Sequence, residues 1–421
     1  MDNLPVELAC AIFAQLKARK KNKQDLASCS LVSRRWRQIT LPQLFEKLRI
    51  TYRVHDYSKE ACPAESEGKP DIAVFVHSLD LTQDDWTTEA TDPEILSLIF
   101  NQLPSLRNVE LTNVCVGETF GDPSIEHVVD RHLDRLRISL DHCNMSGYPV
   151  PPTPCILRTI SFFRSIDMLS LRNGSYRDKT LVDDHSTGLP LLSLPAPKQL
   201  EIGNSFPLHL LIPILNSQSL LRNVETLIMG NAKRIIADDK DVQAIEYLLT
   251  YVSATLLYFA PPKFEYKYAD VQSTLLSPLR KLETLYLTIW TVDPTADWLD
   301  TTHLLRSTIP TLRTVHLDVQ ADLGTQRETK RYFEKAASCI MHLEDILMAM
   351  AASGSLNRVI LSLTDHNSAM KRPFRETVIF HFGKIFPRLR KQGILECIRL
   401  SKPEHHISIS GLSLRLAFMI D

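Results

Sequence analysis

The amino-acid sequence predicts an α/β protein: a short helical head followed by a long array of strand-containing repeats. In the head, residues 4–48 carry apolar side chains at helical spacing. Beyond residue 70, eleven apolar triplets similar to Leu-x-Leu recur, with first members at positions 79, 109, 138, 169, 200, 227, 257, 285, 315, 359 and 398. The first eight gaps span 27–31 residues, and the last two span 44 and 39. Alternation inside a triplet indicates a short strand, and the gaps leave room for helices. Such repeats stack into a solenoid, because no single repeat can cover its own apolar face.

The head is expected to form three short helices. Asn3 caps the first helix, and Pro5 suits its first turn, where no amide donor is needed. A second helix begins at Asp25 and a third near Ser33, and Pro42 restarts the chain after it. The large apolar side chains of these helices are Leu4, Leu8, Ile12, Phe13, Leu16, Leu26, Leu31, Val32, Trp36, Ile39, Leu44 and Phe45. About 45 residues cannot bury so many apolar groups, so a partner or the following domain must cover some of them.

Short motifs follow one another through this head. They are Leu4-Pro5-x-Glu7-Leu8, Ile12-Phe13, Leu16, Asp25-Leu26, Ser30-Leu31-Val32-Ser33, Trp36-Arg37 and Leu44-Phe45. In this order they resemble an F-box, the adaptor-binding module of SCF-type ubiquitin ligases. The resemblance implies a three-helix module that docks on a Skp-family adaptor, which bridges to a cullin and a RING protein. The adaptor contacts that it implies are Leu4, Pro5, Leu8, Ile12, Phe13, Leu26, Leu31, Val32 and Trp36.

One stretch departs from the family pattern, because the basic run at residues 17–23 is longer than the usual loop between the first two helices. A solvated loop is the favoured interpretation. A nuclear import signal and a contact with an acidic surface of a partner are the alternatives.

The repeats resemble leucine-rich repeats, at the long end of that family's spacing. Residues 103–113 and 279–287 are closest to the consensus, and most units lack the Asn or Cys expected after the second strand leucine. The resemblance implies a parallel sheet on the concave face of a solenoid and helices on its convex face. Head and repeats together are similar to fungal F-box proteins with leucine-rich repeats. The expected domains are an F-box at 1–50, a linker at 51–72 and about eleven irregular units at 73–421.

A separate structural prediction applies to each of three stretches of the array. The Pro-rich residues 146–154 should form an extended surface excursion. The 44-residue gap should contain a helix from about residue 328 to 352. Residues 407–416 alternate apolar with small or polar residues and should form terminal strands that cap the open edge.

A ligand of such a solenoid is expected on the concave face. Two residues of each unit point to this face: the residue between the two strand leucines and the residue that follows them. In the first half these positions form an acidic stripe that could steer a basic segment of a target: Asp80, Glu110, Asp141 and Glu201. In the second half they form a neutral aromatic stretch typical of a recognition hot spot: Ile228, Tyr258 and Tyr286. Strand surfaces also carry such residues without binding anything, so that alternative stays open. A register slip of one residue would reverse the assignment of a unit.

The sequence contains no recognisable catalytic, cofactor-binding or metal-binding motif. Phosphate loops of the GxxxxGK[ST] and GxGxxG types, the GxSxG elbow and the HExxH helix are all missing, and only 13 glycines occur. His405-His406, Asp183-Asp184 and residues 238–241 favour solvated loops over metal sites. The eight cysteines contain no CxxC spacing and should be buried free thiols. We therefore expect a non-catalytic protein without a cofactor.

The composition bears on which class of partner the protein binds and on the compartment in which it is found. Residues 1–50 hold ten Lys and Arg against four Asp and Glu, and the remainder holds 38 against 45. This small basic excess lacks interleaved aromatic residues and does not favour a nucleic-acid partner. Neither a secretory signal nor an apolar run of membrane-spanning length is recognised, so a soluble intracellular protein, cytoplasmic or nuclear or both, is expected.

The family resemblance implies the function: a substrate-recognition subunit of an SCF-type ligase, whose solenoid holds an unidentified target protein. An interaction scaffold that acts outside a ligase is one alternative. An enzyme whose site is too dispersed for motif reading is the other.

Overall fold

The computed structural model describes residues 10, 12–13, 23–52, 72–83, 91–114, 116, 129–140, 152–172, 194–203, 208–229, 235–236, 238–264, 274–290, 293, 295–306, 310–321, 326–365 and 384–400. The chain divides into two compact units. Unit 1 comprises Met1–Phe206 and Ser217–Leu220, and unit 2 comprises Pro207–Asn216 and Leu221–Asp421.

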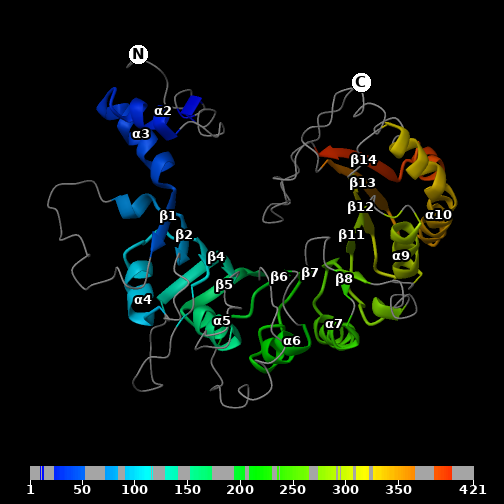
Figure 1. Ribbon diagram of the computed structural model, residues 1–421, viewed down its shortest axis with the longest axis horizontal. Coiled ribbons are helices and arrows are strands. Elements are labelled where there is room, and N and C mark those ends of the chain that lie inside the picture. Colours follow the sequence, from blue (N-terminus) through cyan, green and yellow to red (C-terminus); the bar gives the residue numbers. More distant parts are fainter. Residues whose placement is uncertain are drawn as a thin grey trace. The chain divides into compact units, whose positions relative to one another are not determined.

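Unit 1 combines head helices with a parallel β-sheet. Its elements are α2 (Lys23–Ser30), α3 (Arg34–Phe45), β1 (Lys47–Tyr52), η2 (Ile72–Phe75), β2 (Ser78–Gln83), α4 (Pro93–Asn101), β3 (Asn108–Thr112), β4 (Val129–Ser139), α5 (Pro152–Ser161), β5 (Phe163–Arg172) and β6 (Gln199–Ile202). The strands lie in space in the same order as in the sequence, from β1 to β6, and each neighbouring pair is parallel. Figure 1 shows α4 and α5 on one face of these strands.

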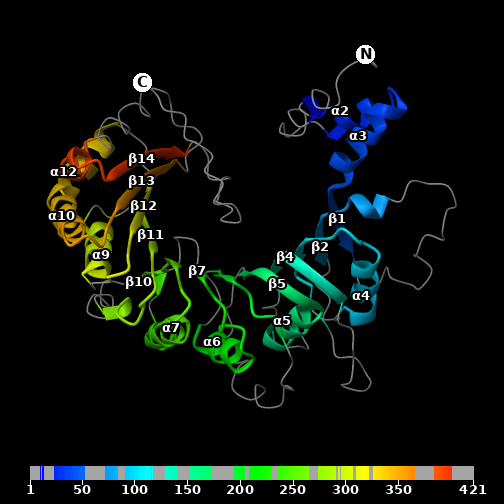
Figure 2. The same ribbon diagram turned by 180° about the vertical axis from the view of Figure 1, so that it is seen from behind.

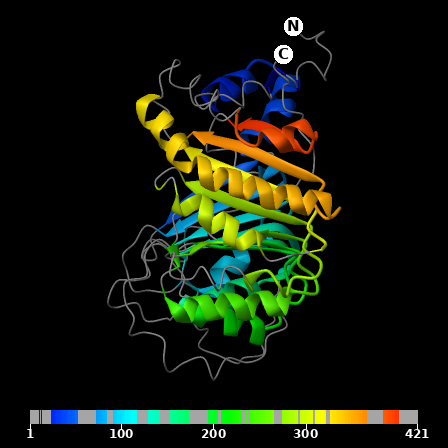
Figure 3. The ribbon, with the colours of Figure 1, turned by 90° about the vertical axis from the view of Figure 1, so that its right-hand side faces the viewer.

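Unit 2 repeats this arrangement with a second set of parallel strands. Its elements are α6 (Leu208–Ser217), β7 (Thr226–Met229), β8 (Ile235–Ile236), α7 (Asp239–Val252), β9 (Tyr258–Ala260), β10 (Lys263–Phe264), β11 (Thr284–Trp290), α9 (Ala296–Leu305), β12 (Thr314–Ala321), α10 (Gln326–Ala352), β13 (Arg358–Asp365), α12 (Pro387–Lys391) and β14 (Leu395–Leu400). The sheet order is β7-β9-β11-β12-β13-β14, again with parallel neighbours. Strands β8 and β10 form a separate parallel pair, and Figure 2 shows β10 and α12 from behind. The long helix α10 lies beside α9 (Figure 3).

The apolar triplet residues form the core of each unit, because strand pairing aligns them in rows. In unit 1 one row runs through Leu79, Val109, Leu136, Leu169 and Leu200, all almost fully buried. In unit 2 the corresponding row is Leu227, Phe259, Leu285, Val315 and Val359. Burial of such a row removes one full face of the sheet from water, which is the main favourable contribution to folding here.

A repeated backbone bend lies at the start of β2, β3, β9 and β11–β13 and within β4. In each case two successive amides donate to the carbonyl of the residue just before the preceding strand. In unit 1 the accepting carbonyls belong to Glu46, His77 and Arg107, and in unit 2 to Glu225, Leu257, Glu283 and Arg313. The side chains before the bend lie at the exposed end of the strands, and the alternation of buried and polar residues begins after it.

The predicted strands are confirmed, since each of the eleven triplets lies on or beside one of the parallel strands β2–β7, β9 and β11–β14. Strand β1 is an additional strand that the sequence analysis missed. Its Leu48-Arg49-Ile50 precedes Leu79 by 31 residues, so the repeat spacing could have found it. Because β1 pairs with β2 and ends at Tyr52, the sheet begins before the start of the linker predicted at 51–72. Residues 53–71 lie outside the described residues.

Three strands have a register that differs from the predicted one. In β4 the residue aligned with Val109 is Leu136, not Ile138. In β9 Phe259 takes the place predicted for Leu257, which is exposed at the bend. In β14 Leu395 takes the place predicted for Ile398. Shifts of two residues keep the predicted faces, whereas the shift of three in β14 reverses them.

The helix predictions agree with the structure in part. Ser33 caps α3 by accepting a hydrogen bond from the amide of Trp36, and α10 occupies the long gap as expected. Pro42 lies inside α3 and does not restart the chain. Residues 152–154 of the predicted extended excursion form the first turn of α5, where proline is tolerated because that amide needs no helical partner. The strands predicted at 407–416 lie outside the described residues.

Candidate functional site

The head has a small aromatic and aliphatic core. Phe13 and Leu26 are buried, with Cys29, Trp36, Ile39 and Leu44 packed against them. The ring centroids of Phe13 and Trp36 are 5.2 Å apart in an edge-to-face arrangement. Three of the predicted adaptor contacts, Phe13, Leu26 and Trp36, therefore contribute to the interior of the head.

Three other predicted adaptor contacts are exposed apolar side chains, which together are called the head patch below. Leu31 is 85 % exposed, Val32 61 % and Ile12 44 %. Leu31 and Val32 lie in the turn between α2 and α3, where their amides donate to the carbonyls of Ser28 and Cys29 at 3.1 Å. Large apolar side chains that remain this exposed are candidates for contact with a partner. Leu4, Pro5 and Leu8 lie outside the described residues, and adaptor binding by all nine residues stays a prediction.

The predicted acidic stripe of unit 1 is paired with basic side chains of neighbouring strands. Nε of Arg49 donates to Asp80 at 2.8 Å, and Lys47 lies 3.4 Å from the same carboxylate. An Nη of Arg137 donates to Glu110 at 3.0 Å. Neutralised carboxylates cannot steer a basic segment as free ones would, so this part of the binding prediction loses its electrostatic basis. Asp141 lies outside the described residues.

Glu201 is the most enclosed carboxylate of a mixed-charge cluster at the β4–β6 end of this face. It accepts hydrogen bonds from Arg172 at 2.6 Å and from Ser170 at 2.8 Å, and Arg135 lies 3.7 Å away. Burial raises the pKa of Glu201, but the charges of Arg172 and Arg135 and the two hydrogen bonds outweigh burial and leave the pKa below its usual value. The carboxylate is thus ionised and held in place by its partners.

The basic residues of this face are the ones that the sequence analysis did not select. Lys47 and Arg49 belong to the missed strand β1, and Arg137 was missed because β4 was placed two residues too late. The triplet Leu136-Arg137-Ile138 matches the repeat pattern as well as Ile138-Ser139-Leu140 does. The row that joins Arg49, Asp80, Glu110 and Arg137 across four strands is visible only after the register is fixed.

The predicted aromatic stretch of unit 2 is only partly supported by burial. Tyr258 aligns with Thr284 of β11, two positions before Tyr286, so the two tyrosines share one face but are offset along it. Ile228 aligns with Ala260, two positions after Tyr258. Both tyrosines are half-buried, and burial together with the nearby Asp318 charge raises the pKa of each hydroxyl far above its usual value. These two side chains therefore belong to an enclosed polar network more than to an open surface.

That network centres on Asp318, which is 2 % exposed. The hydroxyl of Ser362 donates to Asp318 Oδ1 at 2.9 Å and lies 2.8 Å from His316 Nε2. Because a serine hydroxyl has one proton, His316 must donate from Nε2. The ring of Tyr286 packs edge-to-face on His316, with centroids 4.5 Å apart. In this arrangement His316 donates to the serine hydroxyl and does not accept its proton, so the two residues are not arranged as the nucleophile and base of a Ser-His pair.

Burial lowers the pKa of His316 to about 4; Asp318 and Glu396 oppose this shift and Arg358 assists it. Since an unfolded histidine titrates near 6.5, the unfolded state binds more protons between these two values. We expect the contribution of His316 to the free energy of unfolding to be complete above about pH 6.5 and to decrease as the pH falls toward 4. By pH 5 the loss should reach about 2 kcal/mol relative to a His316→Gln variant. Urea unfolding at pH 7.5 and pH 5 measures it, and an equal loss in both proteins would contradict the assignment.

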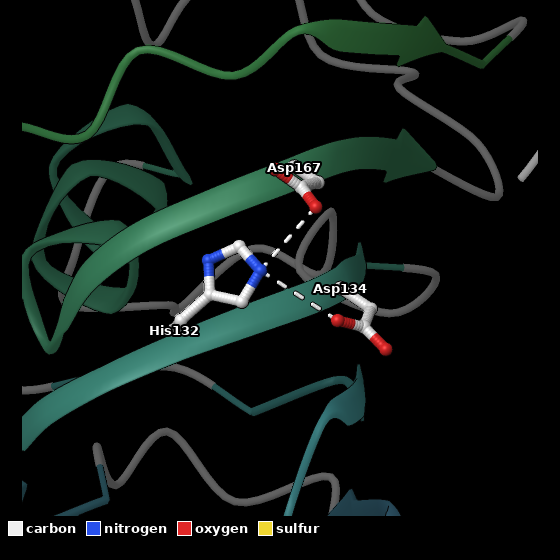
Figure 4. A group of neighbouring side chains, drawn as sticks. All are labelled: His132, Asp134 and Asp167. Carbon is white, nitrogen blue, oxygen red and sulfur yellow. Dashed lines mark ion pairs between the residues drawn. The ribbon is translucent and has the colours of Figure 1, made fainter.

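A third group of titratable side chains lies at the exposed beginnings of β4 and β5 (Figure 4). Nε2 of His132 lies 3.3 Å from Asp167 and 3.6 Å from Asp134, and its Nδ1 lies 2.8 Å from the hydroxyl of Ser165. One ligand atom from each of these three side chains lies within 4.8 Å of the other two. An imidazole that donates from Nε2 to a carboxylate accounts for this geometry as well as a divalent cation does. The cluster therefore could hold a metal but does not indicate one.

Comparison with known protein families matches residues 1–51 to the F-box-like family. A search among curated proteins found no match for the chain. The family match thus covers the head, and it supports an F-box-like domain there. Among the described residues, no helix has both the length and the apolar character that crossing a membrane requires.

Proposed function

We propose that this chain is the substrate-recognition subunit of an SCF-type cullin–RING ubiquitin ligase. In this proposal the F-box-like head docks on a Skp-family adaptor, and the repeat region holds a target protein. The F-box-like match at residues 1–51 is the observation that carries the proposal, because F-box domains generally bind Skp-family adaptors.

The head patch supports the docking step. A partner that covers Leu31 and Val32 would bury two large apolar side chains that the described part of the head leaves exposed. Full burial of each is worth roughly 1.5–3 kcal/mol, enough to make this small surface important for affinity. The patch lies on a compact helical module, so little conformational freedom is lost on binding.

The regular sheets of both units support a repeat region of the leucine-rich type. Strands follow each other in sequence order, helices lie between them, and the same two-amide bend recurs at the strand starts. We propose that these repeats form an irregular solenoid, with the polar side of the strands as its target-binding face. A rigid array of this kind presents side chains at fixed spacing to a partner.

In this role the protein makes and breaks no covalent bond and needs no cofactor. It contributes proximity and orientation, since it would hold the target near a ubiquitin-charged enzyme on the RING protein. The compartments expected for this work are the cytoplasm, the nucleus or both. A scaffold that binds the adaptor outside a ligase is the competing function.

The test is assembly of the full chain with purified Skp-family adaptor, cullin and RING protein, followed by size-exclusion chromatography. We expect one complex that contains all four proteins. Failure to bind the adaptor would overturn the proposal, and binding of the adaptor without cullin would favour the scaffold. Depletion of the chain in its native cells should then stabilise the proteins that co-purify with it, whereas unchanged half-lives would argue against a receptor.

A further inference from the structure

The polar side of the unit 1 sheet has an excess of positive charge. Where β1–β6 are paired in register, this side carries five basic side chains against three acidic ones: Lys47, Arg49, Arg135, Arg137 and Arg172 against Asp80, Glu110 and Glu201. The excess is concentrated on β4 and β5, where three arginines share Glu201 and part of Glu110. We call Arg135, Arg137 and Arg172 the arginine cluster.

Arg135 is the least satisfied member of the arginine cluster. Its side chain is 33 % exposed, and its ion pair among the described residues, with Glu201, is long at 3.7 Å. Nε of Arg135 and Nε of Arg137 are shielded from solvent and have no hydrogen-bond partner among the described residues. A partly desolvated guanidinium costs free energy when its charge is weakly paired, and an acceptor that reaches the exposed part of the Arg135 side chain would recover some of it.

The neighbours of Arg135 add to this cost. Its pKa is lowered by burial and by the like charges of Arg137 and Arg172, which outweigh the nearby carboxylates. An added negative charge at this point would therefore find a local positive field and several oriented N–H groups. Guanidinium groups bind carboxylates in paired, charge-assisted hydrogen bonds.

The spacing of the arginine cluster matches an extended peptide. Arg135 and Arg137 lie two residues apart on the same side of β4, a separation of roughly 6.6 Å. Alternate side chains of an extended peptide have the same separation. Arg172 is aligned with Ser139 on the next strand, which places it within roughly 8 Å of Arg137. A nucleic acid fits less well, since the aligned described residues on this side include no aromatic side chain for base stacking.

We propose that the arginine cluster binds an extended segment of a partner protein in which Asp or Glu alternates with other residues. This inference rests on the proposed function, because it assigns a chemistry to the segment of the target that contacts unit 1. It also reverses the polarity of the sequence-based expectation, in which an acidic stripe attracted a basic segment.

The test is fluorescence anisotropy of the full chain with a labelled short peptide of alternating Glu and Gly. We expect saturable binding that weakens as salt is raised, and a loss of about tenfold or more in Arg135→Gln. The matched control is Arg164→Gln, which removes the same charge from β5 at a site roughly 26 Å along the strand from Arg172. Arg164 is exposed and paired with Asp130, so this variant should bind normally. Thermal melts should show both variants as stable as the parent.

Three outcomes would overturn the inference: equal binding of a Gln–Gly peptide, unchanged affinity in Arg135→Gln, or tighter binding of a single-stranded oligonucleotide of equal charge. Adaptor capture by the same preparations separates the two proposals. Normal capture of the adaptor without peptide binding rejects only the arginine cluster. Peptide binding without adaptor capture rejects the ligase role and leaves the cluster in place.

Discussion

Replacing Leu31 and Val32 together with aspartate is expected to abolish capture of a Skp-family adaptor. Both side chains are exposed and lie in a turn whose backbone hydrogen bonds do not depend on them, so the head should keep its fold. Loss of two buried apolar side chains from the interface, together with burial of two charges, should weaken binding by at least about a hundredfold. The affinity of the full chain for the purified adaptor is measured in a binding assay with the adaptor immobilised on a surface.

Two further variants give this experiment its controls. Gln38→Asp introduces one such charge at an exposed position of α3, outside the head patch, and should bind the adaptor normally. Phe13→Ala removes a core side chain of the head and should reduce binding by unfolding it, with a matching loss of helical circular dichroism. Normal adaptor binding by the Leu31/Val32 double variant would show that the head patch serves another partner or none.

Replacing Trp298 with alanine is expected to destabilise unit 2 by about 3–5 kcal/mol. Trp298 is fully buried on α9, donates from its indole nitrogen to the hydroxyl of Tyr332 at 2.8 Å, and packs edge-to-face with Phe386. Alanine would leave a large cavity between α9 and α10 and would also remove the hydrogen-bond partner of a buried hydroxyl. Urea unfolding followed by near-ultraviolet circular dichroism measures the loss.

Trp298→Phe separates the two contributions. Phenylalanine keeps most of the packing but cannot donate to Tyr332, so its cost should be about 1–2 kcal/mol. A loss in Trp298→Ala that is no larger than that of the phenylalanine variant would mean that the site collapses around the smaller side chain, contrary to its place in this core.

The strands were predictable because their signal is local. In Leu285-Tyr286-Leu287 and Val315-His316-Leu317, apolar and other residues alternate within three positions. This pattern predicts a strand from adjacent residues alone, without knowledge of the tertiary structure. Exact register was less accessible, as β4 demonstrates: two overlapping triplets around Ile138 fit the pattern equally, and only pairing with β3 selects Leu136. Strand β1 was missed because it directly follows the head and was assigned to it.

The candidate binding surfaces were harder to predict than the strands. The motif positions of the head include both Phe13, which is buried, and Leu31, which is exposed, and the sequence pattern treats them alike. In the sheet, Asp80 and Glu110 were expected to be free acids, because their partners Arg49 and Arg137 are 31 and 27 residues away in the sequence. The half-burial of Tyr258 and Tyr286 near Asp318 was not visible for the same reason.

The sequence by itself determined the helical head with its F-box motifs and the order of the strands from β2 onward that carry the repeated triplets, since helical spacing and alternation are properties of neighbouring residues. Only the tertiary structure decided which head residues face inward, which carboxylates are neutralised and where basic charge remains in excess. The physical reason is distance along the chain. Burial and ion pairing depend on surfaces contributed by the next strand, about thirty residues away, and a register shift there changes each side chain's neighbours.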